Sequence, residues 1–123
     1  MNLLLDTHIV LWWLTDDPTL PDEIKSALDQ EPDVYISAAT VWEVTIKQVK
    51  GKLGPADLPE QISSSGFREL QISSRHAMTA GRLPLIHNDP FDRMLVAQAQ
   101  CEGLTFVTRD SNCKLYDVDI LSA

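Results

Sequence analysis

The stretch HNDPFDRMLVAQAQCEGLTFVTRD, His87–Asp110, contains the clearest structural signals of the chain. Asp89 is a preferred N-cap residue, and a proline follows at the first helical position, where its missing N–H costs nothing. Gly103 stands where a left-handed residue ends a helix, so we predict a helix over Pro90–Glu102. The apolar run Thr105–Val107 comes next and predicts a strand. A helix followed directly by a strand is typical of an α/β fold.

Short apolar runs alternate with helical periodicity over the rest of the chain, which also predicts an α/β fold. The predicted strands are Leu3–Leu5, Val34–Ile36, Leu70–Ile72, Thr105–Val107 and Val118–Ile120. The other predicted helices are His8–Leu14, a segment after Pro21 with Leu20, Ile24, Ala27 and Leu28 at helical spacing, a segment from the N-cap Ser37 to about Lys50, and Arg75–Arg82. The first, second and fourth strands are almost entirely apolar, as parallel strands buried on both faces are.

The composition is that of an ordinary globular domain, because 44% of the 123 residues are hydrophobic and 23% are charged. It excludes a disordered chain, a collagen-like repeat and a disulfide scaffold. Met1–Leu14 lacks the basic start of a signal peptide, and no stretch reaches the roughly 18 apolar residues of a membrane span. Cys101 and Cys113 are too far apart for a CxxC motif. We therefore expect one soluble, cytoplasmic domain over residues 1–123, with no membrane as a partner.

The net charge of −8 argues against a surface that grips nucleic acid without specificity. The charge is unevenly distributed: residues 1–33 hold eight acids and one base, Lys25, whereas residues 34–123 hold ten acids and nine bases. The later part of the chain can therefore present a basic face locally.

Four acidic residues occupy related places in the predicted fold. Asp6 follows the first strand, Asp110 follows the fourth, Glu43 lies in the second turn of a helix and Asp92 in the first turn of another. The carboxyl ends of parallel strands and the amino ends of the following helices share one edge of an α/β sheet. We therefore expect the four side chains to converge.

Each of these acids also has a purely structural interpretation. Asp6 or Asp110 would cap the next helix, and Glu43 would pair with Lys47 one turn away. Asp92 would complete a capping box or complement the helix dipole. Taken one at a time, the four residues leave both interpretations open.

Their joint placement favours a cation site, because carboxylates gathered at one edge repel one another and raise each other's pKa unless a cation neutralises them. Oxygen ligands select hard cations such as Mg²⁺ or Mn²⁺, and the sequence has no Cys/His cluster that would indicate zinc. One or two such ions would activate a water for in-line attack on a phosphodiester. This chemistry needs no nucleophilic Ser, Cys or His.

The helix that carries Glu43 has an apolar stripe, which we expect to face the core: Ala38, Trp42, Ile46 and Val49. Glu43 lies off this stripe, and Lys47 and Lys50 share its face. These lysines would contact substrate phosphates, or form an ordinary solvated face. For His8, His76 and His87 we expect structural hydrogen bonds rather than metal ligation, with His87 nearest to a substrate.

Four segments together resemble one known family: LLLDTHIVLWWL, SAATVWEVTIKQVKGKL, the quoted stretch His87–Asp110, and YDVDIL. They are similar to PIN-domain ribonucleases of the VapC toxin type. The resemblance implies a three-layer α/β/α sandwich with a central, mainly parallel sheet of four to five strands. It further implies that an acidic pocket binds Mg²⁺ or Mn²⁺ and hydrolyses RNA.

Motif by motif, the resemblance assigns catalysis and metal binding to Asp6, Glu43, Asp92 and Asp110, with Asp6 and Asp92 holding the principal ion. It matches hydroxyl positions to Thr7 and Thr108 and a basic position to Arg93; with Lys47 and Lys50 these are the secondary, substrate-binding candidates. Asp89 belongs to the same motif but suits an N-cap better than a ligand.

The resemblance also implies three partners: an RNA substrate, a second copy of the chain in a homodimer, and a small cognate antitoxin whose tail crosses the acidic pocket. The acidic first third would help to attract a basic tail. Two alternatives remain. One is a non-catalytic module that keeps the fold for binding. The other is a Mg²⁺-binding receiver domain, which is disfavoured because Asp6 stands alone after its strand and no lysine follows the last one.

Overall fold

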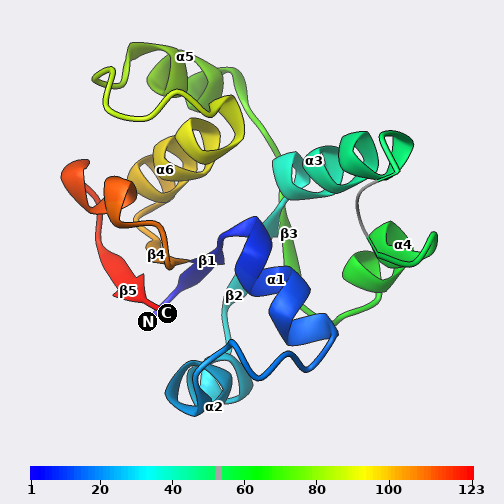
Figure 1. The fold of residues 1–123 in the computed structure, drawn as a ribbon. Helices are drawn as coiled ribbons and strands as arrows, with labels where there is room; N and C mark the ends of the chain where they lie inside the picture. The colour runs from blue at the N-terminus through cyan, green and yellow to red at the C-terminus, as the bar shows by residue number, and fades with distance from the viewer. Residues whose placement is uncertain (52–53) are drawn as a thin grey trace.

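The computed structural model describes residues 1–51 and 54–123, and its centre is a five-stranded sheet (Figure 1). Residues 52–53, the last two of the quoted segment SAATVWEVTIKQVKGKL, lie outside the described residues. The strands follow the order β3-β2-β1-β4-β5, and every neighbouring pair is parallel. Their bounds are β1 Leu3–Leu5, β2 Val34–Ser37, β3 Arg68–Leu70, β4 Thr105–Thr108 and β5 Ile120–Ser122. The predicted parallel sheet is confirmed.

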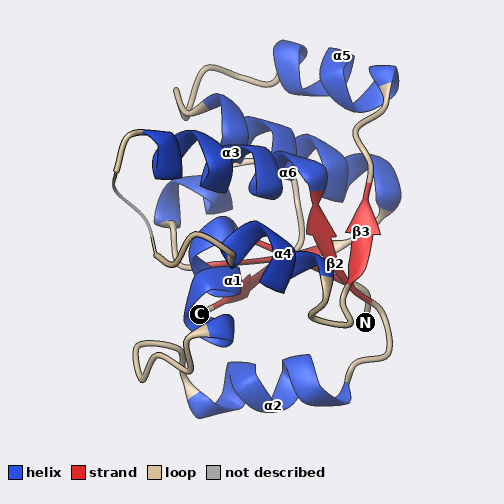
Figure 2. Cartoon of the chain, turned by 90° about the vertical axis from the view of Figure 1, so that its right-hand side faces the viewer, coloured by secondary structure: helices blue, strands red, loops and turns tan. Residues whose placement is uncertain are grey.

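Helices cover both faces of the sheet, which gives the three predicted layers (Figure 2). The helical elements are α1 Thr7–Leu14, α2 Asp22–Gln30, α3 Ala38–Val49, α4 Leu58–Ser63, α5 Ser74–Arg82, α6 Pro90–Glu102 and the 3₁₀ turn η1 Ser111–Leu115. The side chains of β1 alternate between the faces: Leu3 and Leu5 lie in the core under α1, α2 and α4, whereas Leu4 lies in the core under α5 and α6.

The predicted limits of α6 are confirmed at both ends. The Asp89 side chain accepts a hydrogen bond from the Phe91 N–H at 2.8 Å, and the helix begins at Pro90. Gly103 ends it with a φ of 65°, a left-handed conformation that a glycine adopts without strain. Ser37 likewise caps α3 by accepting from the Ala39 N–H at 3.0 Å. These caps fix where each helix starts relative to the strand beside it.

Both edge strands were predicted two residues away from their place. We predicted Leu70–Ile72 and Val118–Ile120, but the strands are Arg68–Leu70 and Ile120–Ser122. Edge strands are half exposed, so their apolar pattern is weak and the pairing partner decides their register. The short elements α4 and η1 were not predicted at all.

The strand order brings the ends of β1 and β4 together. The chain adds β2 and β3 on one side of β1, and then returns to place β4 and β5 on the other. Such a reversal opens a crevice at the carboxyl ends of the two central strands, where α/β proteins bind ligands. The order also differs from the 2-1-3-4-5 order of flavodoxin-like receiver domains, which removes that alternative. Among the described residues, no helix is long and apolar enough to cross a membrane.

Candidate active site

Asp6 lies at this crevice, directly after β1. Its side chain caps α1 by accepting the Thr7 N–H at 2.6 Å, and it accepts the Thr108 hydroxyl of β4 at 2.7 Å. The residue is buried. Burial raises the pKa of Asp6, and the two hydrogen bonds oppose that rise. Asp6 therefore caps α1, as the sequence suggested, and the same side chain also lies in the crevice.

Glu43 projects from α3 toward Asp6 and is only 6% exposed. The Thr7 hydroxyl donates to its Oε1 at 2.7 Å, and the Lys47 ammonium lies 2.9 Å from its Oε2. The predicted pair with Lys47 is therefore present. A buried carboxylate needs such partners, because its desolvation is otherwise costly.

The predicted apolar stripe of α3 is wrong. The residues that α3 buries are Ala39, Thr40, Glu43 and Val44, whereas Trp42 is 61% and Val49 89% exposed. The inward face of α3 is thus mixed, and the Thr7 hydroxyl of another element satisfies the buried carboxylate of Glu43. Trp42 instead packs edge-on against Phe91, with ring centroids 5.2 Å apart.

Asp92 lies in the first turn of α6 and is half-buried. Burial, and then the negative charges of Asp6 and Asp89, raise the pKa of Asp92 to about 7. The capping box that would have explained Asp92 is not formed, because the Asp89 N–H donates to His87 Nδ1 instead. Of the four acids, Asp92 thus has the weakest structural explanation and the most strongly perturbed charge.

Asp110 follows β4 and faces Asp92 across the crevice. Its Oδ1 accepts the Asn112 N–H at 2.9 Å and so caps η1, while its Oδ2 lies 2.7 Å from His87 Nε2. Burial raises the pKa of Asp110, but the hydrogen bonds from Asn112 and His87 outweigh it and leave the pKa below its usual range. The crevice therefore holds Asp110, whose lowered pKa favours ionisation, and Asp92, whose raised pKa opposes it.

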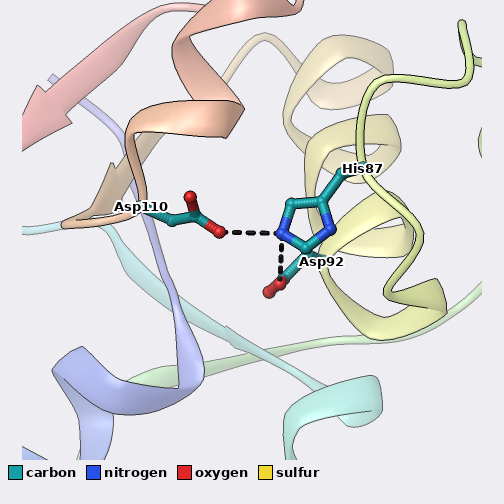
Figure 3. A group of neighbouring side chains, drawn as sticks. All are labelled: His87, Asp92 and Asp110. Atoms are coloured by element: carbon teal, nitrogen blue, oxygen red, sulfur yellow. Dashed lines mark hydrogen bonds and ion pairs between the residues drawn. The ribbon is translucent and has the colours of Figure 1, made fainter.

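His87 lies between these two acids, as Figure 3 shows. Its Nε2 is 2.7 Å from Asp110 and 3.1 Å from Asp92. Burial lowers the pKa of His87, but the Asp110 hydrogen bond and the charges of Asp92 and Asp110 outweigh it, so the pKa is raised. We expected His87 to lie nearest to a substrate but did not predict its contacts with the two acids, although its place two residues before the N-cap of α6 was a usable signal.

The acids divide between two adjoining pockets. Asp6, Asp92 and Asp110 line one of about 300 Å³, together with His8, Trp12 and Arg109. Glu43 lines a second with Lys47, Lys50 and Phe91. The charge of Glu43 still raises the pKa of both Asp6 and Asp92, so these three acids act on one another across the two pockets.

The secondary candidates have different surroundings. Thr7 and Thr108 are buried and orient Glu43 and Asp6, whereas Lys50 is exposed at the second pocket. The Arg93 guanidinium turns away from the acids and donates to the carbonyls of Ala80, Leu83 and Pro84, besides that of His87. Arg93 therefore fastens the loop before α6, and we do not place it against a substrate.

Arg109 is a pocket residue that the sequence analysis did not single out. Its guanidinium lies over the Trp12 ring, 4.6 Å from the centroid, and donates to the carbonyls of Ala123 and Thr19. These partners lie near the two ends of the chain, so no local pattern could have indicated the contact.

The donor set fits a hard divalent cation. Oxygen atoms dominate it, and the pKa of Asp92 is raised first by burial and then by the negative charges of Asp6 and Asp89. His87, Asp92 and Asp110 each place one ligand-type atom within 4.8 Å of the others. A bound Mg²⁺ or Mn²⁺ would relieve the repulsion among these carboxylates.

Solved structures share this fold over nearly the whole chain. The VapBC2 complex of Rickettsia felis bound to a promoter DNA fragment matches with a TM-score of 0.75 and 18% identity, covering 99% of this chain and 98% of that one. FitAcB of Neisseria gonorrhoeae matches at 0.69 and 24% identity, covering 98% and 96%. VapBC-5 of Mycobacterium tuberculosis, a member of the VapBC family of toxin–antitoxin systems, matches at 0.63 and 19% identity, covering all of both chains.

No curated protein sequence matches the chain. The family model described as the PIN domain matches residues 3–121, from the first residue of β1 to the middle of β5. The matched span includes all four acids of the crevice. The chain therefore belongs to the PIN domain family.

Proposed function

We propose that this protein is a metal-dependent endoribonuclease that hydrolyses RNA phosphodiester bonds and serves as the toxin of a toxin–antitoxin pair. The observation that carries the proposal is the gathering of Asp6, Glu43, Asp92 and Asp110 at the reversal point of a PIN-domain sheet, with the pKa of Asp92 raised to about 7. Strongly perturbed acids in a crevice are typical of functional sites.

Asp6 and Asp92 would hold the principal Mg²⁺ or Mn²⁺, and Glu43 and Asp110 would complete the pocket. The ion would supply Lewis-acid activation of water and stabilise the charge that develops on the phosphate. The chain's own residues prepare the site: Thr108 fixes one oxygen of Asp6 and Thr7 fixes one oxygen of Glu43. These bonds hold the carboxylates in place before any ligand arrives.

Lys47 and Lys50 would meet the phosphates on either side of the scissile bond. Both line the pocket next to the acids, and Lys47 already lies against Glu43. A cation beside an acidic pocket offsets its repulsion of a polyanion. A net charge of −8 makes such local cations necessary for RNA to approach.

The proposed protein partners are a cognate antitoxin and a second copy of this chain. Support for the antitoxin comes from the fold shared with VapBC structures, one of which is named as part of a toxin–antitoxin system. The acidic first third of the chain would attract a basic antitoxin tail, so we expect the affinity to fall as salt is raised. Light scattering on the purified protein tests the dimer, and a monomeric mass would contradict it.

The function is tested by incubating a mixed RNA pool with the wild type, Asp92→Asn, and the matched control Asp119→Asn, each with Mg²⁺, with Mn²⁺ or with chelator. Asp119 is exposed, so its variant removes the same charge outside the pocket. We expect cleavage by the wild type and the control with metal only, and a loss of about 100-fold or more in Asp92→Asn. Cleavage in chelator would contradict the proposal. If no protein cleaves and none binds Mn²⁺, the non-catalytic module is the better account.

A further inference from the structure

The two ring nitrogens of His87 have different kinds of partner. The Asp89 N–H donates to Nδ1 at 3.1 Å, so in the neutral ring Nδ1 carries a lone pair and no hydrogen. Nε2 faces the carboxylate oxygens of Asp110 at 2.7 Å and Asp92 at 3.1 Å. Carboxylate oxygens accept hydrogen bonds, so Nε2 carries the ring hydrogen. Two independent contacts therefore assign the same tautomer.

An Nε2 that carries a hydrogen has no lone pair for a metal. To ligate an ion through Nε2, the ring would have to move its hydrogen to Nδ1 and lose the bond from Asp89. That bond belongs to the turn in which Asp89 also caps α6. The local structure thus stabilises the donor form of His87 against the ligand form.

The backbone of His87 is held as firmly as its ring. Its N–H donates to the Tyr116 hydroxyl at 2.8 Å, and that hydroxyl donates in turn to the Pro84 carbonyl at 3.1 Å. Arg93 fixes the same loop from the other side through the carbonyls of Ala80 and Pro84. Two elements therefore place the imidazole between the acids.

We propose that His87 is a positioning residue: its Nε2–H donates to Asp110 and lies beside the Asp92 carboxylate, so the ring holds both acids in the orientation that binds the divalent cation, and His87 is not itself a ligand. The inference rests on the proposed function only in taking these acids as part of the cation site. Hydrogen bonds to ligating groups commonly change metal affinity by about 10- to 100-fold.

His76 provides a matched control elsewhere in the fold. Its Nδ1 accepts the Ser73 N–H at 3.0 Å, and its Nε2 lies 2.9 Å from Glu102. The pattern is the same, but among residues 1–51 and 54–123 no second acid pairs with the ring. Substituting His76 therefore removes a similar buried interaction without touching the cation site.

The first test is ¹⁵N NMR of the imidazole rings in the wild type, without and with saturating Mg²⁺, with His87→Gln used to assign the signal. Above the raised pKa of His87, where the ring is neutral, we expect the Nε2–H form in both states. Loss of the Nε2 hydrogen and a shift of that nitrogen when Mg²⁺ binds would overturn the proposal.

The second test is the Mg²⁺ affinity by calorimetry. We expect a loss of about 10- to 100-fold in His87→Leu, recovery of most of it in His87→Gln, whose amide still donates, and the wild-type value in His76→Leu. Wild-type affinity in a folded His87→Leu would overturn the proposal, as would a Gln variant no better than Leu. Unchanged affinity in Asp92→Asn would instead contradict the cation site itself, and neither readout depends on RNA cleavage.

Discussion

His76 and His87 are built into the chain in the same way but serve different surroundings. Each accepts a backbone N–H on Nδ1 near the start of a helix and directs Nε2 at a carboxylate. His76 meets one carboxylate, Glu102, whose side chain is 41% exposed. His87 meets two half-buried carboxylates at the reversal point of the sheet. The comparison teaches that the placement of charge, not the local motif, separates a structural contact from a candidate active site.

The largest expected difference between the two regions is in catalysis. We expect Asp6→Asn and Asp92→Asn to lower RNA cleavage by about 100-fold or more, because each removes a proposed cation ligand, and Glu102→Gln to leave it within about twofold. Initial rates on one RNA at saturating Mg²⁺ measure this. Comparable losses in all three variants would erase the distinction between the regions.

The next effect concerns the hydroxyl that orients Asp6. Thr108→Val removes the donor to Asp6 and the acceptor of the Asp110 N–H, so we expect a loss of about 1–3 kcal/mol in the free energy of unfolding. It also removes a bond that holds down the pKa of Asp6, so Mg²⁺ should bind more weakly. Urea unfolding and calorimetry measure both effects. Thr79→Val, on the helix of His76, should change stability alone.

A smaller effect is the dependence of stability on pH. The folded state holds the Asp92 proton up to a pKa of about 7, against 3.8 for the free side chain, so stability without metal falls as the pH rises through that interval. His87 acts in the same direction: its contribution is present below 6.5 and is lost as the pH rises through its raised pKa. Asp110, with a lowered pKa, loses its contribution only at lower pH.

Melting temperatures in chelator between about pH 5 and pH 8 test this expectation, and a decrease of several degrees is expected. Asp92→Asn should flatten most of the slope and melt higher at pH 8, because a half-buried charge is gone. Glu102→Gln keeps Asp92 and should keep the decrease. A wild type that becomes more stable toward pH 8 would refute the crowded-acid description.

The smallest effect is expected at Asp89, which caps α6. Asparagine caps helices as well as aspartate does, so Asp89→Asn should change the free energy of unfolding by only a few tenths of a kcal/mol and keep RNA cleavage. Its lost charge should lower the pKa of Asp92, so Mg²⁺ should bind at slightly lower pH. Abolished cleavage would instead make Asp89 a ligand.

The central fold could be predicted because its signals are local. The strands β1, β2 and β4 are buried on both faces and read as continuous apolar runs, and α6 carries its own start and stop residues. The edge strands β3 and β5 could not be placed as well, since their pairing partners set their register. The wrong face of α3 has a related cause, because the partner of Glu43 is Thr7, far away in sequence.

The candidate site divides in the same way. The four acids follow from their places after strands and at helix starts, together with the family resemblance. The position of His87 depends on Tyr116 and Arg93, which fix its loop from different elements. Arg109 over Trp12 is likewise a purely tertiary contact. The sequence therefore predicts which acidic residues lie near one another, but not the tertiary contacts that fix the residues around them.

The most direct measurement is anomalous diffraction from crystals grown with Mn²⁺. We expect one or two anomalous peaks in the crevice, bonded to oxygens of Asp6 and Asp92, with His87 Nε2 still directed at Asp110. The absence of any peak in this crevice under saturating Mn²⁺ would contradict the account.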